Sequence, residues 1–423
     1  MKRLQKTPWN KLDNAAKIFP PTTTNRDPKV FRFACELYDM VDPNVLQAAL
    51  DKTMKQFPFY KSILKKGLFW YYFEESGLVP TVLEETTAPC QPIYRRDNKT
   101  LLFRVTYYKK RINLEVYHAI SDGTGALHFL RTMVYYYILE KHAGMFPAPP
   151  VFDYDASVGQ KRDDSFSKYY VKGNQKQKRI AMPKAYRLRG DRFAEHRIAV
   201  IEGVVPVGDV LRLAREYHVS ITVFLTAVLI CSIREGMAMR DLSRPVVITI
   251  PVNLRNYFPS VSARNFFGII NAGYRFRGQS EEFGAVVNRV AEQFAQQLTT
   301  ERLQERMTSL SALENNFSMK IIPLAVKDLG MRLANWEEEQ KITAALSNIG
   351  RVTMPESMVP YIRRFDVFTS TNRLQACLCS FENSLTISFT SPLISTDIQR
   401  CFFRRLTQQG IRVELSTNLT EAE

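Results

Sequence analysis

The stretch Tyr117-His118-Ala119-Ile120-Ser121-Asp122-Gly123-Thr124-Gly125 decides how this sequence is interpreted. Residues 111–118 alternate between apolar and polar side chains, which predicts a strand, and residues 125–140 predict a helix. The stretch between them is therefore a strand-to-helix loop, a place where α/β proteins position functional side chains. Its glycines permit a tight turn and the close approach of a ligand.

His118 and Asp122 are the chemically informative side chains of this loop. A histidine with an ordinary pKa near ~6.5 is mostly neutral but still basic, so it can deprotonate an alcohol that attacks a carbonyl. A thioester is already activated, so one base can suffice without a covalent intermediate. No G-x-S-x-G motif is evident, which argues against a hydrolase of that design. Two structural alternatives stay open: a half-buried histidine at a strand end, and an aspartate that only caps the helix.

The rest of the chain alternates between helices and strands in two stretches. In the first stretch we expect a helix over 42–57, opened by Asp42-Pro43, and strands over 68–73 and 100–109. In the second stretch we expect helices over 209–217, 222–235, 281–298 and 396–409. We also expect a strand over 246–252 and a hairpin of 375–381 with 384–391.

The segment from about residue 147 to 193 breaks this alternation with several prolines and glycines. Between Lys168 and Arg192, nine residues are basic and one is acidic. We interpret it as a crossover between two halves. The predicted division is an N-terminal half over 1–160, a basic crossover over 161–197 and a C-terminal half over 198–423. A solvated linker and a phosphate-contacting segment both stay open for the crossover.

The composition is that of a folded globular protein, with 45% hydrophobic and 24% charged residues among 423. The net charge of +16 attracts anions, which include nucleic acid, an anionic membrane and a phosphate-rich small molecule. The sequence contains no zinc-finger spacing, RNA-recognition motif or long basic amphipathic helix. We therefore expect no nucleic-acid partner.

The six cysteines match no metal-site spacing, so we expect buried, reduced thiols and no metal. No apolar segment follows the basic N-terminus, and no stretch reaches the ~18 apolar residues that a membrane span needs. We expect a cytoplasmic monomer without a transmembrane segment. The basic charge leaves peripheral contact with a membrane open.

The loop around His118 resembles the HHxxxDG motif of the CoA-dependent acyltransferase superfamily. That superfamily includes chloramphenicol acetyltransferase, peptide-synthetase condensation domains, wax ester synthases, plant BAHD acyltransferases and alcohol acetyltransferases. The segments 251–255 (PVNLR) and 265–268 (NFFG) resemble elements of wax ester synthases and alcohol acetyltransferases, and 347–350 (SNIG) is a third agreement. The resemblance covers most of the chain. It departs at Tyr117, where many members have a first, mainly structural histidine.

The resemblance implies an α/β fold of two chloramphenicol-acetyltransferase-like halves. Each half would be a mixed sheet flanked by helices, with the active-site tunnel between the halves. The implied co-substrate is an acyl-CoA, with acetyl-CoA the first expectation, and no cofactor stays bound. The implied activity is that of an alcohol O-acetyltransferase, which forms an ester on a small-molecule alcohol.

The resemblance also implies a role for individual residues. His118 would deprotonate the acceptor hydroxyl. Asp122 would be structural and would pair with Arg255 to hold the loop, and the family's glycine at Gly123 would let the loop turn. Asn265 and Gly268 would line the contact between the halves.

Four further residues are weaker candidates for contacts with CoA. Lys178 and Arg179 belong to the basic crossover, while Ser347 and Asn348 are polar residues of a motif that a simple turn would also explain. Two rival functions stay open on the same fold. One is a condensation-type transfer to an amine or a carrier-bound substrate through the same His118, and the other is a non-catalytic binding protein.

Overall fold

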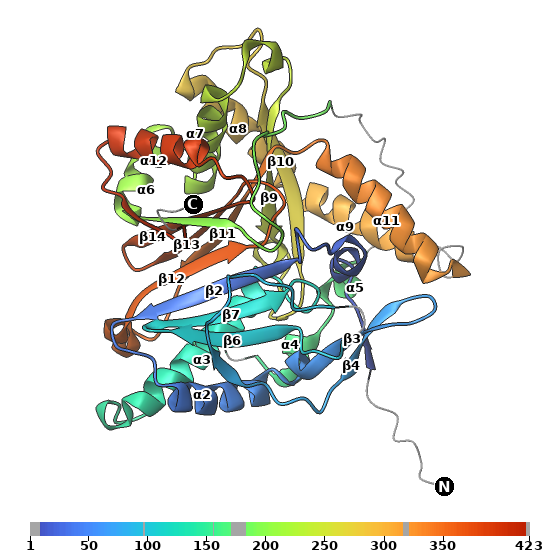
Figure 1. Ribbon diagram of the computed structural model, residues 1–423, viewed down its shortest axis with the longest axis vertical. Coiled ribbons are helices and arrows are strands. Elements are labelled where there is room, and N and C mark those ends of the chain that lie inside the picture. The colour runs from blue at the N-terminus through green and yellow to red at the C-terminus, as the bar shows by residue number, and fades with distance from the viewer. Residues whose placement is uncertain (1–8, 96–97, 155, 171–182, 316–320, 420–423) are drawn as a thin grey trace.

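The computed structural model describes residues 9–95, 98–154, 156–170, 183–315 and 321–419, which form two lobes, one above the other in Figure 1. Each lobe is a sheet with helices on its outer side, and the two sheets approach each other at the middle of the molecule. The predicted α/β fold of two halves, each with a mixed sheet flanked by helices, is confirmed.

The lower lobe is built on a five-stranded sheet with the order β12-β2-β7-β6-β5. Its strands are β2 (Val30–Leu37), β5 (Val82–Glu84), β6 (Phe103–Tyr108), β7 (Arg111–Tyr117) and β12 (Ile362–Thr369). Helices α2 (Pro43–Gln56) and α3 (Gly123–Lys141) lie together below this sheet in Figure 1. Helix α2 begins as predicted, because the Asp42 carboxylate accepts hydrogen bonds from the backbone N–H groups of Asn44 and Val45.

Strand β12 comes from far along the chain and pairs antiparallel with β2, so that Phe365 lies opposite Cys35. The sequence patterns did not predict this strand or β2. The division into 1–160, 161–197 and 198–423 stays a prediction. Strand β12 lies within the range 198–423, so this range supplies strands to both the upper and the lower sheet.

The upper lobe is built on a seven-stranded sheet with the order β10-β9-β11-β13-β14-β8-β15. Its strands are β8 (Ala199–Pro206), β9 (Val246–Asn253), β10 (Phe267–Tyr274), β11 (Ala344–Val352), β13 (Gln375–Phe381), β14 (Ser384–Ser391) and β15 (Glu414–Thr417). The helices on its outer side are α6 (Val207–Glu216), α7 (Ile221–Glu235), α8 (Phe283–Gln297) and α12 (Asp397–Gln408). The predicted hairpin of β13 and β14 is confirmed, with Phe381 opposite Ser384.

Smaller elements flank the junction of the lobes. A separate three-stranded sheet has the order β1-β4-β3. These elements are β1 (Trp9–Lys11), α1 (Phe19–Thr22), β3 (Ser62–Lys66), β4 (Tyr71–Glu75), α4 (Val158–Arg162), α5 (Ser165–Tyr169), α9 (Thr300–Asn315) and α11 (Leu324–Glu339). The strand predicted over 68–73 was wrong at its start, because residues 67–70 form the turn between β3 and β4.

Among the described residues, no single helix is both long and apolar enough to cross a membrane. Helices α6 and α7 reach the required length and composition only as a pair, and their axes are bent by 83° where they meet. The six cysteines are free thiols, five of them buried.

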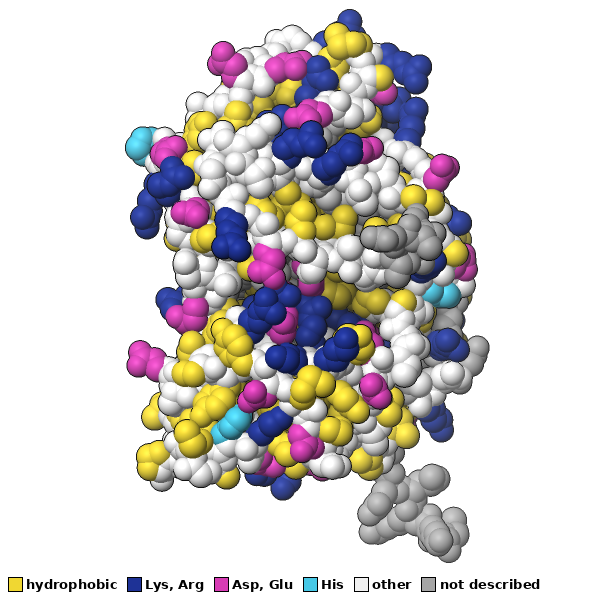
Figure 2. Space-filling model, turned by 60° about the vertical axis from the view of Figure 1, so that its left-hand side comes forward, with side chains coloured by type: hydrophobic (Ala, Val, Ile, Leu, Met, Phe, Trp, Pro, Cys, Tyr) yellow, Lys and Arg dark blue, Asp and Glu magenta, His cyan; other side chains and the backbone are white. Residues whose placement is uncertain are grey.

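Ion pairs join the two lobes at the end of the sheets away from His118. Arg111 at the start of β7 pairs with Asp366 on β12 of the same sheet, and its Nη2 reaches across to the upper sheet, 3.1 Å from a carboxylate oxygen of Glu202 on β8. On the face shown in Figure 2, Lys and Arg side chains are spread over the height of the molecule among acidic ones. The excess positive charge therefore does not form one continuous stripe on that face.

Candidate active site

His118 directly follows β7 at the boundary between the lobes, and its ring is held by aromatic side chains. It stacks on Phe19 of α1 with the ring centroids 4.4 Å apart and an angle of 17° between the planes. Phe31 of β2 meets the same ring edge-on at 4.9 Å. A charged imidazolium loses hydration in such surroundings, so burial lowers the pKa of His118 below 6.5. The ring is therefore neutral at neutral pH.

The proton of this neutral ring is placed by the contacts of Nδ1. That nitrogen lies 3.3 Å from Oδ1 of Asn265. The Nδ2 of Asn265 donates to Oδ2 of Asp13 at 3.4 Å and to the carbonyl of Ala119 at 3.3 Å, which leaves its Oδ1 as an acceptor. Nδ1 must therefore carry the proton, and the lone pair lies on Nε2. This is the tautomer that a base acting through Nε2 needs.

A cavity of about 120 Å³ adjoins His118 between the lobes. The lower lobe contributes Phe31 and Thr369 to its wall, and the upper lobe contributes Val252 and Ser347. Sites for drug-sized ligands usually measure about 300–1,000 Å³. The cavity can therefore hold a reacting centre but not a whole substrate.

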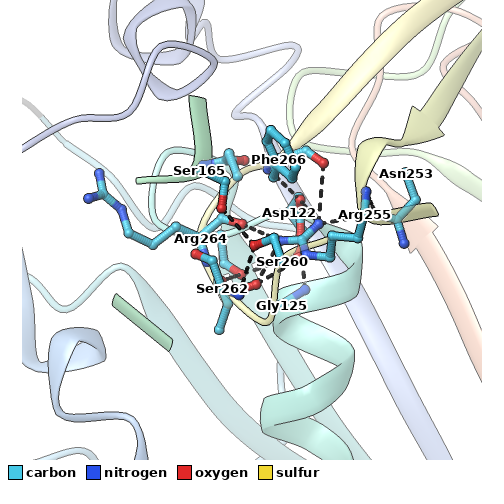
Figure 3. A network of polar contacts seen from close by, with 12 residues as sticks. Asp122, Gly125, Ser165, Asn253, Arg255, Ser260, Ser262, Arg264 and Phe266 are labelled. Atoms are coloured by element: carbon cyan, nitrogen blue, oxygen red, sulfur yellow. Dashed lines mark hydrogen bonds and ion pairs between the residues drawn. The ribbon is translucent and has the colours of Figure 1, made fainter. Parts of the chain in front are cut away.

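Asp122 lies at the wall of the cavity, but its carboxylate oxygens are occupied by other groups. Oδ1 accepts a hydrogen bond from the backbone N–H of Gly125 at 2.9 Å, which makes Asp122 the N-cap of α3. Oδ2 accepts from the backbone N–H of Phe266 and from Nη1 of Arg255, both at 2.7 Å (Figure 3). The side chains of Asp122 and Arg255 are 5% and 8% exposed, so this ion pair is buried.

Arg255 is saturated by hydrogen bonds around Asp122, as Figure 3 shows. Nε and Nη2 donate to the carbonyl of Ser262 at 3.1 and 2.8 Å, and Nη2 also donates to the carbonyl of Arg264 at 2.6 Å. Arg255 thereby ties the loop of the lower lobe to the backbone turn over 262–266 in the upper lobe. A buried guanidinium with this many acceptors meets the requirement that buried charges be paired and hydrogen-bonded.

The loop needs glycine at positions 123 and 125 because a side chain at either position would collide with neighbouring atoms. A Cβ on Gly125 would lie 2.0 Å from the carbonyl oxygen of Ala263, and a Cβ on Gly123 would lie 2.8 Å from the side chain of Ile349. Gly123 does not have a positive φ, so the backbone freedom of glycine is not what this position requires, and its expected role in the turn stays a prediction. Its missing side chain lets β11 approach the loop. Ser121 strengthens the contact of the loop with Ala263, since its hydroxyl donates to the carbonyl of Ala263 at 2.6 Å.

The other predicted residues have different environments. Gly268 lies in β10 opposite Val252 and is not among the described residues that line the cavity. Asn348 lines it, but its amide is engaged, donating to Oγ1 of Thr222 at 2.9 Å and accepting from the N–H of Gly350 at 2.8 Å. Lys178 and Arg179 lie outside the described residues.

Sequence reasoning missed three residues outside the motif: Phe19 and Phe31, which contact the ring of His118, and Asp13, which accepts a hydrogen bond from Asn265. Asp13 is fully buried, and this burial raises its pKa to about 6, although Arg264 at 3.4 Å acts in the opposite direction. These residues precede His118 by more than eighty positions. Only the pairing of β2 with β7 and the packing of α1 bring them to the site, and no local pattern indicates that.

Comparisons with known proteins identify the fold. No protein-family model matches the chain, and no curated protein matches its sequence. TRI101 of Fusarium sporotrichioides, solved with coenzyme A and T-2, superposes with a TM-score of 0.67 at 10% identity, over 97% of this chain and 100% of that one.

Two further solved structures agree with this match. The trichothecene 15-O-acetyltransferase TRI3 of the same organism has a TM-score of 0.61 at 9% identity, over 95% of this chain and 94% of that one. The first condensation domain of the calcium-dependent antibiotic synthetase has a TM-score of 0.58 at 15% identity, with coverage of 95% and 96%. The chain therefore has the fold shared by these acetyltransferases and condensation domains, as the sequence resemblance predicted.

The buried pair of Asp122 and Arg255 generates the first prediction. Removing one partner of a buried ion pair typically costs about 3–5 kcal/mol, because the other charge stays buried without compensation. Asp122→Ala and Arg255→Ala should each lower the melting temperature. The double variant should lose much less than the sum of the two, as a double-mutant cycle by thermal or denaturant unfolding would show. Strictly additive losses would contradict the pairing.

Proposed function

We propose that the protein transfers an acyl group from coenzyme A to the hydroxyl group of an alcohol, with His118 as the general base. The observation that carries the proposal is the neutral His118, whose tautomer places the lone pair on Nε2 and which lines a cavity between the lobes. The shared fold with TRI3, a trichothecene 15-O-acetyltransferase, supports the same reaction type. The small volume beside His118 favours a short acyl group such as acetyl.

The reaction follows from the position of this base. Nε2 of His118 takes the hydroxyl proton as the alcohol oxygen attacks the thioester carbonyl and a C–O bond forms. The C–S bond then breaks, and the imidazolium returns the proton to the leaving sulfur. The products are an ester and the free thiol of coenzyme A, and His118 is neutral again. No group on the enzyme needs to carry the acyl chain.

The negative charge that develops on the carbonyl oxygen needs a hydrogen-bond donor. Ser347 is the best candidate, since it lies in the cavity wall with His118 while the amide of its neighbour Asn348 is engaged elsewhere. Donors aimed at a developing oxyanion usually contribute strongly to such reactions.

A basic cavity is the candidate site for the phosphates of coenzyme A. It measures about 670 Å³ and is lined by Arg26, Arg187, Arg192 and Arg373 together with Glu195 and Glu339, so basic residues outnumber acidic ones by four to two. Arg187 and Arg192 belong to the predicted basic crossover. Arginine is well suited to phosphate because its planar group donates two parallel hydrogen bonds.

A condensation-type transfer to an amine or carrier-bound substrate is the alternative function, because a condensation domain has the same fold. A mass-spectrometric screen with acyl-CoAs against alcohols and amines would separate the two. A non-catalytic role is less well supported, since His118 is neutral and lines the cavity. The cytoplasmic location and the monomeric state stay predictions.

His118→Ala tests the proposed function. Loss of a positioned base should lower kcat by about 10²–10⁴-fold with little change in melting temperature. The matched control is His142→Ala, because His142 caps the far end of the same helix α3, away from the cavity. It should keep normal turnover in an assay of free CoA release. Near-normal activity of a folded His118→Ala protein would overturn the assignment.

Ser347→Ala tests the oxyanion assignment. Removing one such donor should lower kcat by about 10²-fold while the Michaelis constants for both substrates change little, because the interaction strengthens only in the transition state. Steady-state kinetics would check this. A Ser347→Ala enzyme that keeps its kcat would assign the oxyanion to another donor.

The double change of Arg187 and Arg192 to Ala tests the phosphate site. At low salt it should raise the Michaelis constant for acyl-CoA several-fold and leave that for the alcohol unchanged, since exposed charge contacts are individually weak and salt-screened. The control is the same double change at Arg212 and Arg400, which are exposed on the outer helices α6 and α12. An unchanged constant for acyl-CoA would show that this part of the crossover is only a linker.

A further inference from the structure

Helix α11 exposes an apolar stripe to solvent. Val326, Leu329, Leu333 and Trp336 are 58%, 59%, 60% and 61% exposed. Their spacing of three, four and three residues places them on one side of the helix. Figure 1 shows α11 at the right-hand edge of the molecule, where it projects beside α9.

The side of α11 that faces the protein is mixed, because its two buried residues are the apolar Leu324 and the polar Asp328. Asp328 is 6% exposed and accepts a hydrogen bond from the hydroxyl of Tyr71 at 2.8 Å. Nε of Arg332 donates to the carbonyl of Pro21 at 2.8 Å. A helix on the surface of a protein in water normally buries its apolar side and exposes its polar side. Helix α11 departs from this rule on its outer side, where four large apolar residues are exposed, and an exposed apolar stripe of this kind indicates contact with an apolar environment.

The turn between β3 and β4 extends this stripe. Leu68, Phe69 and Trp70 are 74%, 37% and 39% exposed. The carbonyl of Leu68 accepts a hydrogen bond from the N–H of Leu324 at 2.9 Å, which joins the turn to the start of α11. The α11 surface, as we name it, consists of Leu68, Phe69, Trp70, Val326, Leu329, Leu333 and Trp336.

All three tryptophans of the chain are at this side of the molecule and partly or mostly exposed. Two belong to the α11 surface, and Trp9 is 60% exposed on β1, which pairs with β4 next to the same turn. Tryptophan is enriched where proteins meet the head-group region of a membrane, because its ring is apolar and its N–H is polar.

Lysines accompany these apolar side chains. Nζ of Lys327 lies 3.6 Å from the centre of the Trp70 ring, and Nζ of Lys17 lies 5.9 Å from it. Burial and the neighbouring charge of Lys17 both lower the pKa of Lys327. Nζ of Lys327 also donates a hydrogen bond to the carbonyl of Phe69 at 3.1 Å, which holds this lysine at the turn between β3 and β4. The acidic Glu337 and Glu338 near Trp336 share Lys341 as a partner, at 3.0 and 2.8 Å, so these three residues together carry one net negative charge.

We propose that the α11 surface docks on an anionic phospholipid membrane. The apolar stripe would enter the boundary between head groups and acyl chains, while Lys17 and Lys327 lie at the level of the lipid phosphates. The positive charge of the chain as a whole, +16, acts in the same direction. Contact with a second copy fits less well, since the lysines of two copies would face each other across a symmetric interface.

Docking in this orientation would bring the membrane next to the site described above. Helix α1 packs against α11 and carries Phe19, the ring that stacks on His118. A cavity of about 370 Å³ lies between these helices and has Pro21, Arg332 and Trp336 in its wall. The membrane contact itself does not depend on the proposed reaction.

Co-sedimentation of the full chain with vesicles tests the proposal. The protein should bind vesicles of equal parts phosphatidylcholine and phosphatidylglycerol, and it should bind vesicles of phosphatidylcholine alone much more weakly. The triple variant Leu329→Ser, Leu333→Ser and Trp336→Ser should bind the anionic vesicles at least about tenfold more weakly, because it lacks most of the apolar stripe. Lys17→Gln with Lys327→Gln should reduce the preference for the anionic lipid.

The matched control changes three other exposed apolar residues to Ser, namely Val151, Met239 and Leu415, which are 93%, 77% and 58% exposed. It should bind as the unaltered protein does, and melting temperatures should confirm that all variants fold. Failure of the unaltered protein to bind anionic vesicles, or full binding by the triple variant, would overturn the proposal. So would light scattering that finds a dimer which the triple variant converts to a monomer, because the α11 surface would then join two copies.

Discussion

The site depends on one constraint: the buried carboxylate of Asp122 must have hydrogen-bond donors for both of its oxygens. Its oxygens accept hydrogen bonds from the start of its own helix, from the backbone turn of the opposite lobe and from Arg255. A buried charge that lost these donors would be strongly destabilising, so the loop has one low-energy position. Because His118 precedes Asp122 by four residues in that loop, the same contacts fix where the base meets the cavity.

The aromatic residues around His118 and the side chain of Asn265 set the protonation state of the base that the ion pair positions. The rings of Phe19 and Phe31 cover part of the imidazole, whose burial keeps it neutral, and Asn265 selects the nitrogen that carries the proton. Asn265 belongs to the turn over 262–266 that Arg255 holds. Arg255, which fixes the loop, and Asn265, which fixes the tautomer of His118, are thus parts of one contact between the lobes.

The sequence predicted the elements whose signals are local. Strand β7 alternates, α2 starts at a capping aspartate, and the loop carries a motif, so each of these was found where it lies. Strand β2 was missed because its residues do not alternate: Phe33, Ala34 and Cys35 are consecutive apolar residues, and the polar Arg32 is buried in an ion pair with Glu115 at 2.7 Å. The apolar run over 68–70 predicted a strand but forms an exposed turn, since hydrophobicity alone does not say what will cover a side chain. The supporting ring of Phe19 depends on packing between distant segments, which no local pattern records.

The pH dependence of kcat/KM for acyl transfer to an alcohol tests the central claim most directly. If neutral His118 is the base and burial lowers its pKa, activity should persist as the pH falls through 6.5 and decline only below that value. The decline should be absent from the residual rate of His118→Ala. An acidic limb at or above 6.5, or the same limb in the variant, would contradict the account.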